Sequence, residues 1–192
     1  MEALFVSTGV VALAEIGDKT QLLAFILAAR FKKPLPIIAG ILCATIINHG
    51  LAGALGAWIT AMVSPDILRW GLGASFIGMA VWTMIPDKIE DEETQIAKKL
   101  GVFGATFITF FLAEMGDKTQ VATVALAAHY ASPFLVVVGT TLGMLLADVP
   151  AVFAGDKLAS KIPMRLVHTI AAGIFALLGV ATLLGAGAKL GF

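Results

Sequence analysis

The chain has 192 residues, of which 59% are hydrophobic and 14% are charged, and its mean hydropathy is +0.95. A soluble domain averages about 45–50% apolar and about 25% charged residues. Lipid must therefore solvate much of the surface, which excludes a soluble enzyme, a nucleic-acid binder and a disordered scaffold. The formal net charge is zero, so no overall field points to an acidic or basic partner. The single cysteine, Cys43, lies in an apolar run and excludes a disulfide framework.

Six hydrophobic segments follow one another along the chain, separated by short polar or proline-containing breaks. A membrane span needs about 20 largely apolar residues, and the runs are too long and too uniform for the alternating strands of a membrane barrel. The start of the chain lacks the basic region of a cleaved signal peptide, so we expect the first span to be retained. The predicted fold is an all-α integral membrane protein with six transmembrane helices, at residues 4–29, 36–62, 67–85, 102–129, 133–154 and 166–188.

Lysine and arginine residues are distributed unequally between the two sets of connecting loops. The first, third and fifth loops lie on one side of the membrane, and the other side carries only Arg69 and Lys189. The basic residues of the first, third and fifth loops are Arg30, Lys32, Lys33, Lys88, Lys98, Lys99, Lys157, Lys161 and Arg165. The positive-inside rule therefore predicts that the lysine-rich side is cytoplasmic and that both termini lie outside. The third loop is also acidic, and we interpret it as a solvated connector that contains Asp87, Glu90, Asp91, Glu92 and Glu93.

The sequence repeats itself at an offset of 99 residues without a gap. This shift places LAEIGDKTQ, residues 13–21, on LAEMGDKTQ, residues 112–120, and it also pairs Phe76 with Phe175 and Thr83 with Thr182. The predicted domains are a first three-helix repeat at 1–86, an acidic cytoplasmic linker at 87–101 and a second repeat at 102–192. Three spans is an odd number, so the second repeat must be inverted relative to the first, which is a common design of transporters with a binding site near the midplane.

Each copy of the repeated motif places charged and amide side chains inside an apolar span. A charge at the bilayer centre costs about 2.5–3.5 kcal/mol on insertion scales, so these groups must pair or face a cavity. On a continuous helix Glu15 and Asp18 would share one face, and Gln21 would extend it. Gly17 and Gly116 are expected to loosen each helix at this point.

Four carboxylates with amide and hydroxyl oxygens suit a hard divalent cation such as Mn²⁺, Ca²⁺ or Mg²⁺. The motif charges sum to minus two, which matches one such ion. The predicted metal ligands are Glu15, Asp18, Gln21, Glu114, Asp117 and Gln120. The predicted supporting or proton-coupling residues are Lys19, Thr20, Lys118, Thr119, Asn48 and Asp148. A purely structural role, in which these groups only hold the helices together, does not account for the same spacing in both halves.

Two further positions lie inside the second and fifth spans. His49 and Asp148 are paired by the 99-residue shift, which suggests that both spans flank one cavity. For His49, a packing or hydrogen-bonding role is as good an interpretation as a functional one. The small residues Gly40 and Ala44, with Gly139 and Gly143 at the equivalent positions, indicate close helix packing.

The doubled Glu-x-Gly-Asp-Lys-Thr motif resembles the cation/proton exchanger family of Golgi and bacterial membranes, which carries two copies of E-x-G-D-[KR]-[TS]. The chain is similar in particular to bacterial manganese exporters of the MneA type, over nearly its whole length. The resemblance implies export of Mn²⁺, or movement of Ca²⁺, in exchange for protons across a bacterial plasma membrane. It implies roles for Glu15, Asp18, Lys19 and Thr20 and for their equivalents Glu114, Asp117, Lys118 and Thr119.

No nucleotide-binding motif is present, so an ion gradient is expected to drive transport, without a cofactor. We expect Glu15 and Glu114 to carry protons alternately and Asp18 and Asp117 to be the steadier ligands. The expected partners are the cation, protons and lipid, with the protein acting as a monomer or homodimer. A passive divalent-cation channel and an exporter of a basic amino acid or other small organic cation remain alternatives. A membrane enzyme fits least, because a duplicated symmetric site suits asymmetric chemistry poorly.

Overall fold

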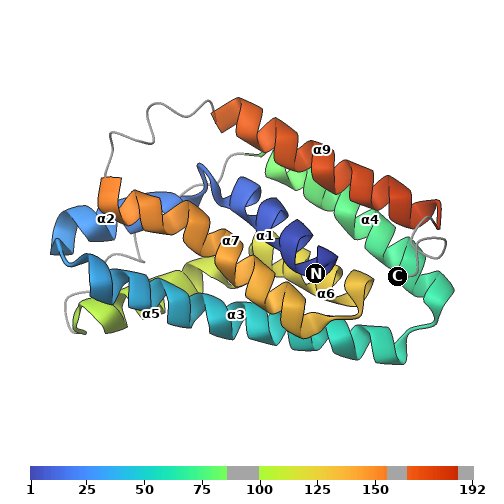
Figure 1. The fold of residues 1–192 in the computed structure, drawn as a ribbon, viewed down its shortest axis with the longest axis horizontal. Coiled ribbons are helices and arrows are strands. Elements are labelled where there is room, and N and C mark those ends of the chain that lie inside the picture. The colour runs from blue at the N-terminus through green and yellow to red at the C-terminus, as the bar shows by residue number, and fades with distance from the viewer. Residues whose placement is uncertain (86–99, 155–163, 186–192) are drawn as a thin grey trace.

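The computed structural model describes residues 1–85, 100–154 and 164–185. The part of the chain so described is all-helical (Figure 1). Its helices are α1 (Glu2–Glu15), α2 (Lys19–Phe31), α3 (Pro34–Met62), α4 (Pro65–Thr83), α5 (Val102–Glu114), α6 (Lys118–Tyr130), α7 (Pro133–Ala154) and α9 (Met164–Leu183). The acidic connector lies outside the described residues, as do Lys157, Lys161 and Lys189.

Two of the expected spans are broken. The expected helices at 4–29 and 102–129 are each two helices, interrupted at residues 16–18 and 115–117. Both interruptions fall on the repeated motif and contain a glycine with positive φ. The expectation that Gly17 and Gly116 loosen the helices is confirmed, and the expectation that Glu15 and Asp18 lie on one continuous helix is wrong.

The helices of the two halves correspond at the 99-residue offset. Adding 99 to the bounds of α2 gives those of α6, and the other pairs agree within a few residues wherever both are described. Contacts between the halves are reciprocal as well. Gly40 of α3 lies against Thr106 of α5, and its equivalent Gly139 of α7 lies against Ser7 of α1, which is the equivalent of Thr106. The expected close packing of the small residues on α3 and α7 is confirmed.

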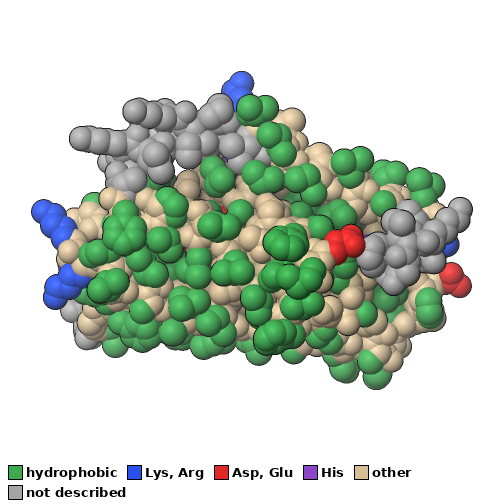
Figure 2. Space-filling model, viewed as in Figure 1, with side chains coloured by type: hydrophobic (Ala, Val, Ile, Leu, Met, Phe, Trp, Pro, Cys, Tyr) green, Lys and Arg blue, Asp and Glu red, His purple; other side chains and the backbone are tan. Residues whose placement is uncertain are grey.

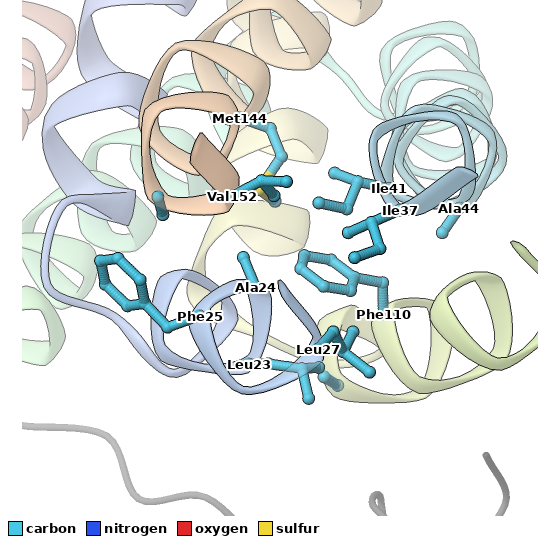
Figure 3. Packing of buried hydrophobic residues seen from close by; sticks show 12 residues of the cluster. Leu23, Ala24, Phe25, Leu27, Ile37, Ile41, Ala44, Phe110, Met144 and Val152 are labelled. Atoms are coloured by element: carbon cyan, nitrogen blue, oxygen red, sulfur yellow. The ribbon is translucent and has the colours of Figure 1, made fainter. Parts of the chain in front are cut away.

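Apolar side chains form two separate clusters. One cluster lies between α2, α3, α5 and the end of α7 (Figure 3), where it includes Leu27, Ile41, Phe110 and Val152. The other joins α1, α4, α6, α9 and the start of α7 and includes Phe76. The chain passes from one cluster to the other through the motif in both halves, because α1 leads into α2 and α5 leads into α6. The polar motifs therefore lie between two apolar regions.

Helices α4 and α9 form an antiparallel pair that packs along one side of the molecule. They lie side by side in Figure 1, with Phe76 of α4 stacked on its equivalent Phe175 of α9 at a centroid distance of 6.5 Å. Within the described residues α9 packs against α1 and α4 against α6, whereas the equivalent contacts of α4 with α5 and of α9 with α2 are marginal at most. The pair therefore departs from the reciprocity of the other helices.

The molecule presents an apolar exterior. Figure 2 shows hydrophobic side chains over most of the visible face, with lysine and arginine side chains at its edges. Leu51 and Trp58 on α3 and Leu146 and Phe153 on α7 are among the exposed large apolar residues. By length and composition two helices, α3 and α7, can cross a membrane. The motif helices α1, α2, α5 and α6 have 13 or 14 residues each, or about 20 Å, so none of these four spans a bilayer alone.

The close approach of α7 to α1 leads to a specific prediction about stability. A Cβ atom at Gly139 would lie 2.6 Å from the backbone oxygen of Leu4, which has no freedom to rotate away. Gly139→Ala should therefore reduce the free energy of unfolding by about 1–3 kcal/mol. Denaturant unfolding of the purified protein in detergent micelles measures this loss.

Gly9→Ala is the matched control for this prediction. Gly9 also lies inside a helix, but a Cβ atom there meets no atom within 4 Å. This substitution should leave stability unchanged or raise it by up to about 1 kcal/mol, because alanine is the better helix former. Equal effects of the two substitutions would contradict the proposed packing constraint.

Candidate cation site

Each motif forms the junction between two helices rather than one turn of a helix. Glu15 is the last residue of α1, Ile16 has an extended backbone, and Asp18 is the N-cap of α2. Between them Gly17 has a φ of +87°, and the equivalent Gly116 has a φ of +78°. Residues with a Cβ atom rarely adopt this left-handed region. Glycine therefore permits the break, which places the two carboxylates on different helices.

The aspartates hold the start of the second helix of each half. The Oδ1 atom of Asp18 accepts a hydrogen bond of 2.7 Å from the backbone N–H of Lys19, which leaves the other carboxylate oxygen for other contacts. Gln21, three residues further, accepts a bond of 2.9 Å from the backbone N–H of Gly17. The same two contacts recur in the second half at 2.7 Å each, between Lys118 and Asp117 and between Gly116 and Gln120.

The glutamine side chains contact the backbone. Besides accepting from Gly17, Gln21 donates from Nε2 to the carbonyl of Ala147 on α7 at 3.0 Å. Gln120 likewise uses its amide oxygen for Gly116. Both glutamines were predicted as cation ligands. In this structure their oxygens stabilise the helix breaks, and Gln21 fixes the first break to α7.

Each motif glutamate is buried and bonded to the threonine of its own motif. Glu15 accepts a hydrogen bond from the Thr20 hydroxyl, and Glu114 accepts one from the Thr119 hydroxyl. Both carboxyl groups are nearly or completely inaccessible to solvent. The second oxygen of each glutamate has no hydrogen-bond partner among the residues that the structure describes. Each glutamate therefore presents one oriented oxygen that is available to a cation or a proton.

The lysine of each motif reaches the aspartate of the other motif. The Nζ atom of Lys118 lies 2.9 Å from Oδ2 of Asp18, and that of Lys19 lies 3.9 Å from Oδ2 of Asp117. These exchanged ion pairs bring the two motifs together, as expected from the repeat. They are unequal, because Lys118 is buried and its contact is short, whereas the side chain of Lys19 is 21% exposed and its contact is long.

Helix α3 contributes two buried polar residues next to the second motif. Asn48 donates from Nδ2 to the carbonyl of Phe111 at 3.1 Å, which connects α3 to the last turn of α5 before Glu114. The Nε2 atom of His49 lies 3.7 Å from Oε1 of Glu114. This distance is longer than a hydrogen bond, but it places the imidazole directly beside the motif carboxylate.

Helix α7 contributes Asp148 to the same region. Its side chain is fully buried, and neither carboxylate oxygen has a hydrogen-bond partner within the described ranges. Asp148 lies close enough to Glu114, Asp18 and Glu15 for their charges to interact. The two positions that the repeat pairs, His49 and Asp148, therefore both border the motif carboxylates, as the sequence suggested.

Three carboxylates come together into a group that can hold a cation. One ligand oxygen from each of Glu15, Glu114 and Asp117 lies within 4.8 Å of the other two. All three residues are buried. Hard divalent cations bind such oxygen ligands, and burial away from water strengthens their attraction to a positive ion. Asp18, which was predicted to be a steadier ligand together with Asp117, is the close partner of Lys118 in this structure.

One contact at the edge of this site has no counterpart in the sequence analysis. The Nε2 atom of His168 on α9 lies 3.0 Å from the carbonyl oxygen of Ile16, inside the first helix break. The repeat gives no signal for this contact, because the residue equivalent to His168 is Arg69 on α4. Only the packing of α9 against the first motif reveals it.

Comparison with known proteins finds the same two-fold repeat in the chain and identifies its family. The family model described as "Divalent cation/proton antiporter GDT1" matches residues 3–91 and again residues 102–189. The chain belongs to the GDT1 family. Its members are cation/proton antiporters and not enzymes, which agrees with the resemblance drawn from the two motifs. No solved structure matches the chain.

Relatives of this GDT1 family protein occur in bacteria and plants. It is 53% identical over 95% of its length to a Vibrio cholerae protein named as a candidate manganese exporter, and it covers 90% of that protein. It is 32% identical to GDT1-like protein 3 of Oryza sativa, with 91% of this chain and 71% of the relative aligned. It is 29% identical to GDT1-like protein 5 of Arabidopsis thaliana, with 90% and 91% aligned.

Proposed function

We propose that this protein exports a divalent cation, Mn²⁺ or else Ca²⁺, from the cytoplasm in exchange for protons. The observation that carries the proposal is the group of buried carboxylates from Glu15, Glu114 and Asp117, drawn from both helix breaks. Membership of a family of divalent cation/proton antiporters and the relation to the Vibrio cholerae protein support it.

In this proposal the protein is a bacterial inner-membrane protein that crosses the bilayer six times as two inverted three-helix repeats. The broken pairs α1–α2 and α5–α6 each cross once, and the site lies near mid-depth, where transporters use discontinuous helices. The reciprocal contacts at the 99-residue offset support this arrangement. The exposed basic residues at the end of α2 and just after it, Arg30, Lys32 and Lys33, face the cytoplasm.

The proposed cation ligands are the free oxygens of Glu15 and Glu114 and the Oδ2 atom of Asp117. Asp18 and Lys118 form the fixed ion pair beside them, and Lys19 is the mobile counterion of Asp117 when the cation has left. Thr20 and Thr119 orient the glutamates. Gln21, Gln120 and Asn48 hold the helix breaks in place.

Proton exchange meets the energetic demand of export. Moving a divalent cation outward against 100 mV costs about 4.6 kcal/mol, at about 2.3 kcal/mol per charge. Two protons moving inward carry the same charge in the opposite direction and cancel this electrical cost. A pair of glutamates that bind either the cation or protons, but not both, couples the two movements.

A liposome assay tests the proposal. Purified protein is sealed into vesicles that contain a pH-sensitive dye, and Mn²⁺, Ca²⁺ and Mg²⁺ are added in turn. The wild type should change the internal pH when a transported cation is added, and Asp117→Asn should abolish this response because it removes a ligand charge. Asp66→Asn is the matched control, since Asp66 is exposed at the start of α4, away from the motifs.

Each other result identifies a different function. Cation entry without proton movement would show that the protein is a passive channel and not an antiporter. Indifference to all three metals, together with proton movement driven by lysine or arginine, would indicate an exporter of small organic cations.

A further inference from the structure

The imidazole of His49 is the one nitrogen ligand candidate beside the carboxylates among the described residues. Its side chain is fully buried on α3, and both ring nitrogens lack a hydrogen-bond partner within the described part of the chain. Its Nε2 atom lies 3.7 Å from Oε1 of Glu114, the oxygen that also accepts from Thr119, and Glu114 is one of the three grouped carboxylates. A buried polar group without a partner is costly unless some ligand satisfies it.

The position of His49 distinguishes the two halves of the site. Glu15 corresponds to Glu114, and Asp117 corresponds to Asp18, but His49 corresponds to Asp148. Both residues are fully buried, and both carry side-chain atoms without hydrogen-bond partners in the described ranges. The first half therefore has an imidazole nitrogen, on α3, at the position where the second half has a carboxylate, on α7.

This difference matters for the choice of cation. Ca²⁺ and Mg²⁺ take oxygen ligands. Imidazole nitrogen suits first-row transition metals, whose affinity for a given nitrogen-containing site rises from Mn²⁺ through Fe²⁺ to Co²⁺. A carboxylate site with one imidazole thus gains affinity for Mn²⁺ that it does not gain for Ca²⁺ or Mg²⁺.

We propose that His49 is a specificity-determining ligand, which binds the transported ion through Nε2 and makes the site select a transition-metal cation over Ca²⁺ and Mg²⁺. The inference rests on the proposed function and goes beyond it, because the three grouped carboxylates are oxygen ligands, which hard divalent cations in general accept. Asp148 occupies the equivalent position on α7.

Equilibrium binding to the purified full chain in detergent tests this inference, with Ca²⁺, Mg²⁺, Mn²⁺ and Co²⁺ as probes. His49→Asn keeps a polar side chain but removes the imidazole. Loss of a residue that only supports a ligand costs about 10–100-fold in metal affinity, so the loss of a ligand should weaken Mn²⁺ binding at least about tenfold. The loss should be larger for Co²⁺ and less than about twofold for Ca²⁺ and Mg²⁺.

Two further variants sharpen the test. His49→Asp copies the residue of the other half and should give an all-oxygen site that prefers Ca²⁺ to Mn²⁺. His129→Asn is the matched control, because His129 packs on Phe76 and Thr182, and its substitution should leave the order of the four affinities unchanged.

An equal loss for all four cations in His49→Asn would show a structural role only and overturn the inference. Pulsed electron paramagnetic resonance of the Mn²⁺-loaded wild type gives an independent answer, because a directly bound imidazole couples its nitrogen nucleus to the metal. Absence of that coupling also overturns the inference, even if the variants fail to fold. Failure of the wild type to bind any of the four cations would instead overturn the proposed function itself.

Discussion

Glu114→Gln and Glu15→Gln should each abolish cation-driven proton movement in liposomes, to the level of protein-free vesicles. Each glutamate is buried, has one oxygen held by a threonine and keeps the other oxygen without a hydrogen-bond partner in the described structure. Glutamine preserves the size and the contact with the threonine. It can neither ionise to bind the cation strongly nor release a proton, so the exchange stops.

Glu2→Gln is the matched control for this prediction. It is the same chemical change at an exposed position on the first turn of α1, and it should leave the rate of the pH change as in the wild type. A normal pH response in either motif variant would refute the proposal that these glutamates couple the cation to protons.

Lys118→Met should cause the largest loss of stability of any single substitution considered. The Nζ atom of Lys118 lies 2.9 Å from Asp18, and both side chains are almost fully buried. Removal of one partner of a buried ion pair leaves the other charge uncompensated and costs about 3–5 kcal/mol. Denaturant unfolding in detergent micelles measures this change in the free energy of unfolding.

A comparison with the other lysine and a double variant tests the reason for this loss. Lys19→Met should cost about 1 kcal/mol or less, because its contact is 3.9 Å and its side chain reaches solvent. The double variant Asp18→Asn with Lys118→Met should be more stable than Lys118→Met alone, since the charge of Asp18 is then removed together with that of its partner. Equal losses for the two lysine variants would contradict the unequal ion pairs.

Much of the site could be predicted from the sequence because the same polar motif occurs in both halves of the repeat. Acidic and amide residues inside apolar runs must be paired or functional in either half, and the same spacing in both halves predicted that the motifs meet. In the structure Lys19 and Lys118 pair with the aspartates. The sequence could not show that each lysine pairs with the aspartate of the other half. In both motifs an aspartate directly precedes the lysine, so pairing within one motif is equally compatible with the sequence.

The local geometry of the motif was predicted less well. Glu15 and Asp18 satisfy the spacing of one helix face, so a continuous helix predicts the wrong arrangement. The glycine between them adopts a positive φ, and Asp18 then caps a new helix. For the same reason Gln21 could be named as a ligand but not as the residue that closes the helix break. Backbone conformation at a single glycine decides these roles, and composition does not reveal it.

The one-sided packing of α4 and α9 has a thermodynamic consequence for the proposed exchange. In the described structure α9 contacts α1, and α4 contacts α6. The repeat makes these contacts equivalent to those of α4 with α5 and of α9 with α2, which are marginal. Two arrangements built from equivalent surfaces differ little in free energy, so the ligand that binds one of them better can set the balance between them. In the proposed exchanger, a difference in binding energy between the two arrangements would then set the end at which the site opens.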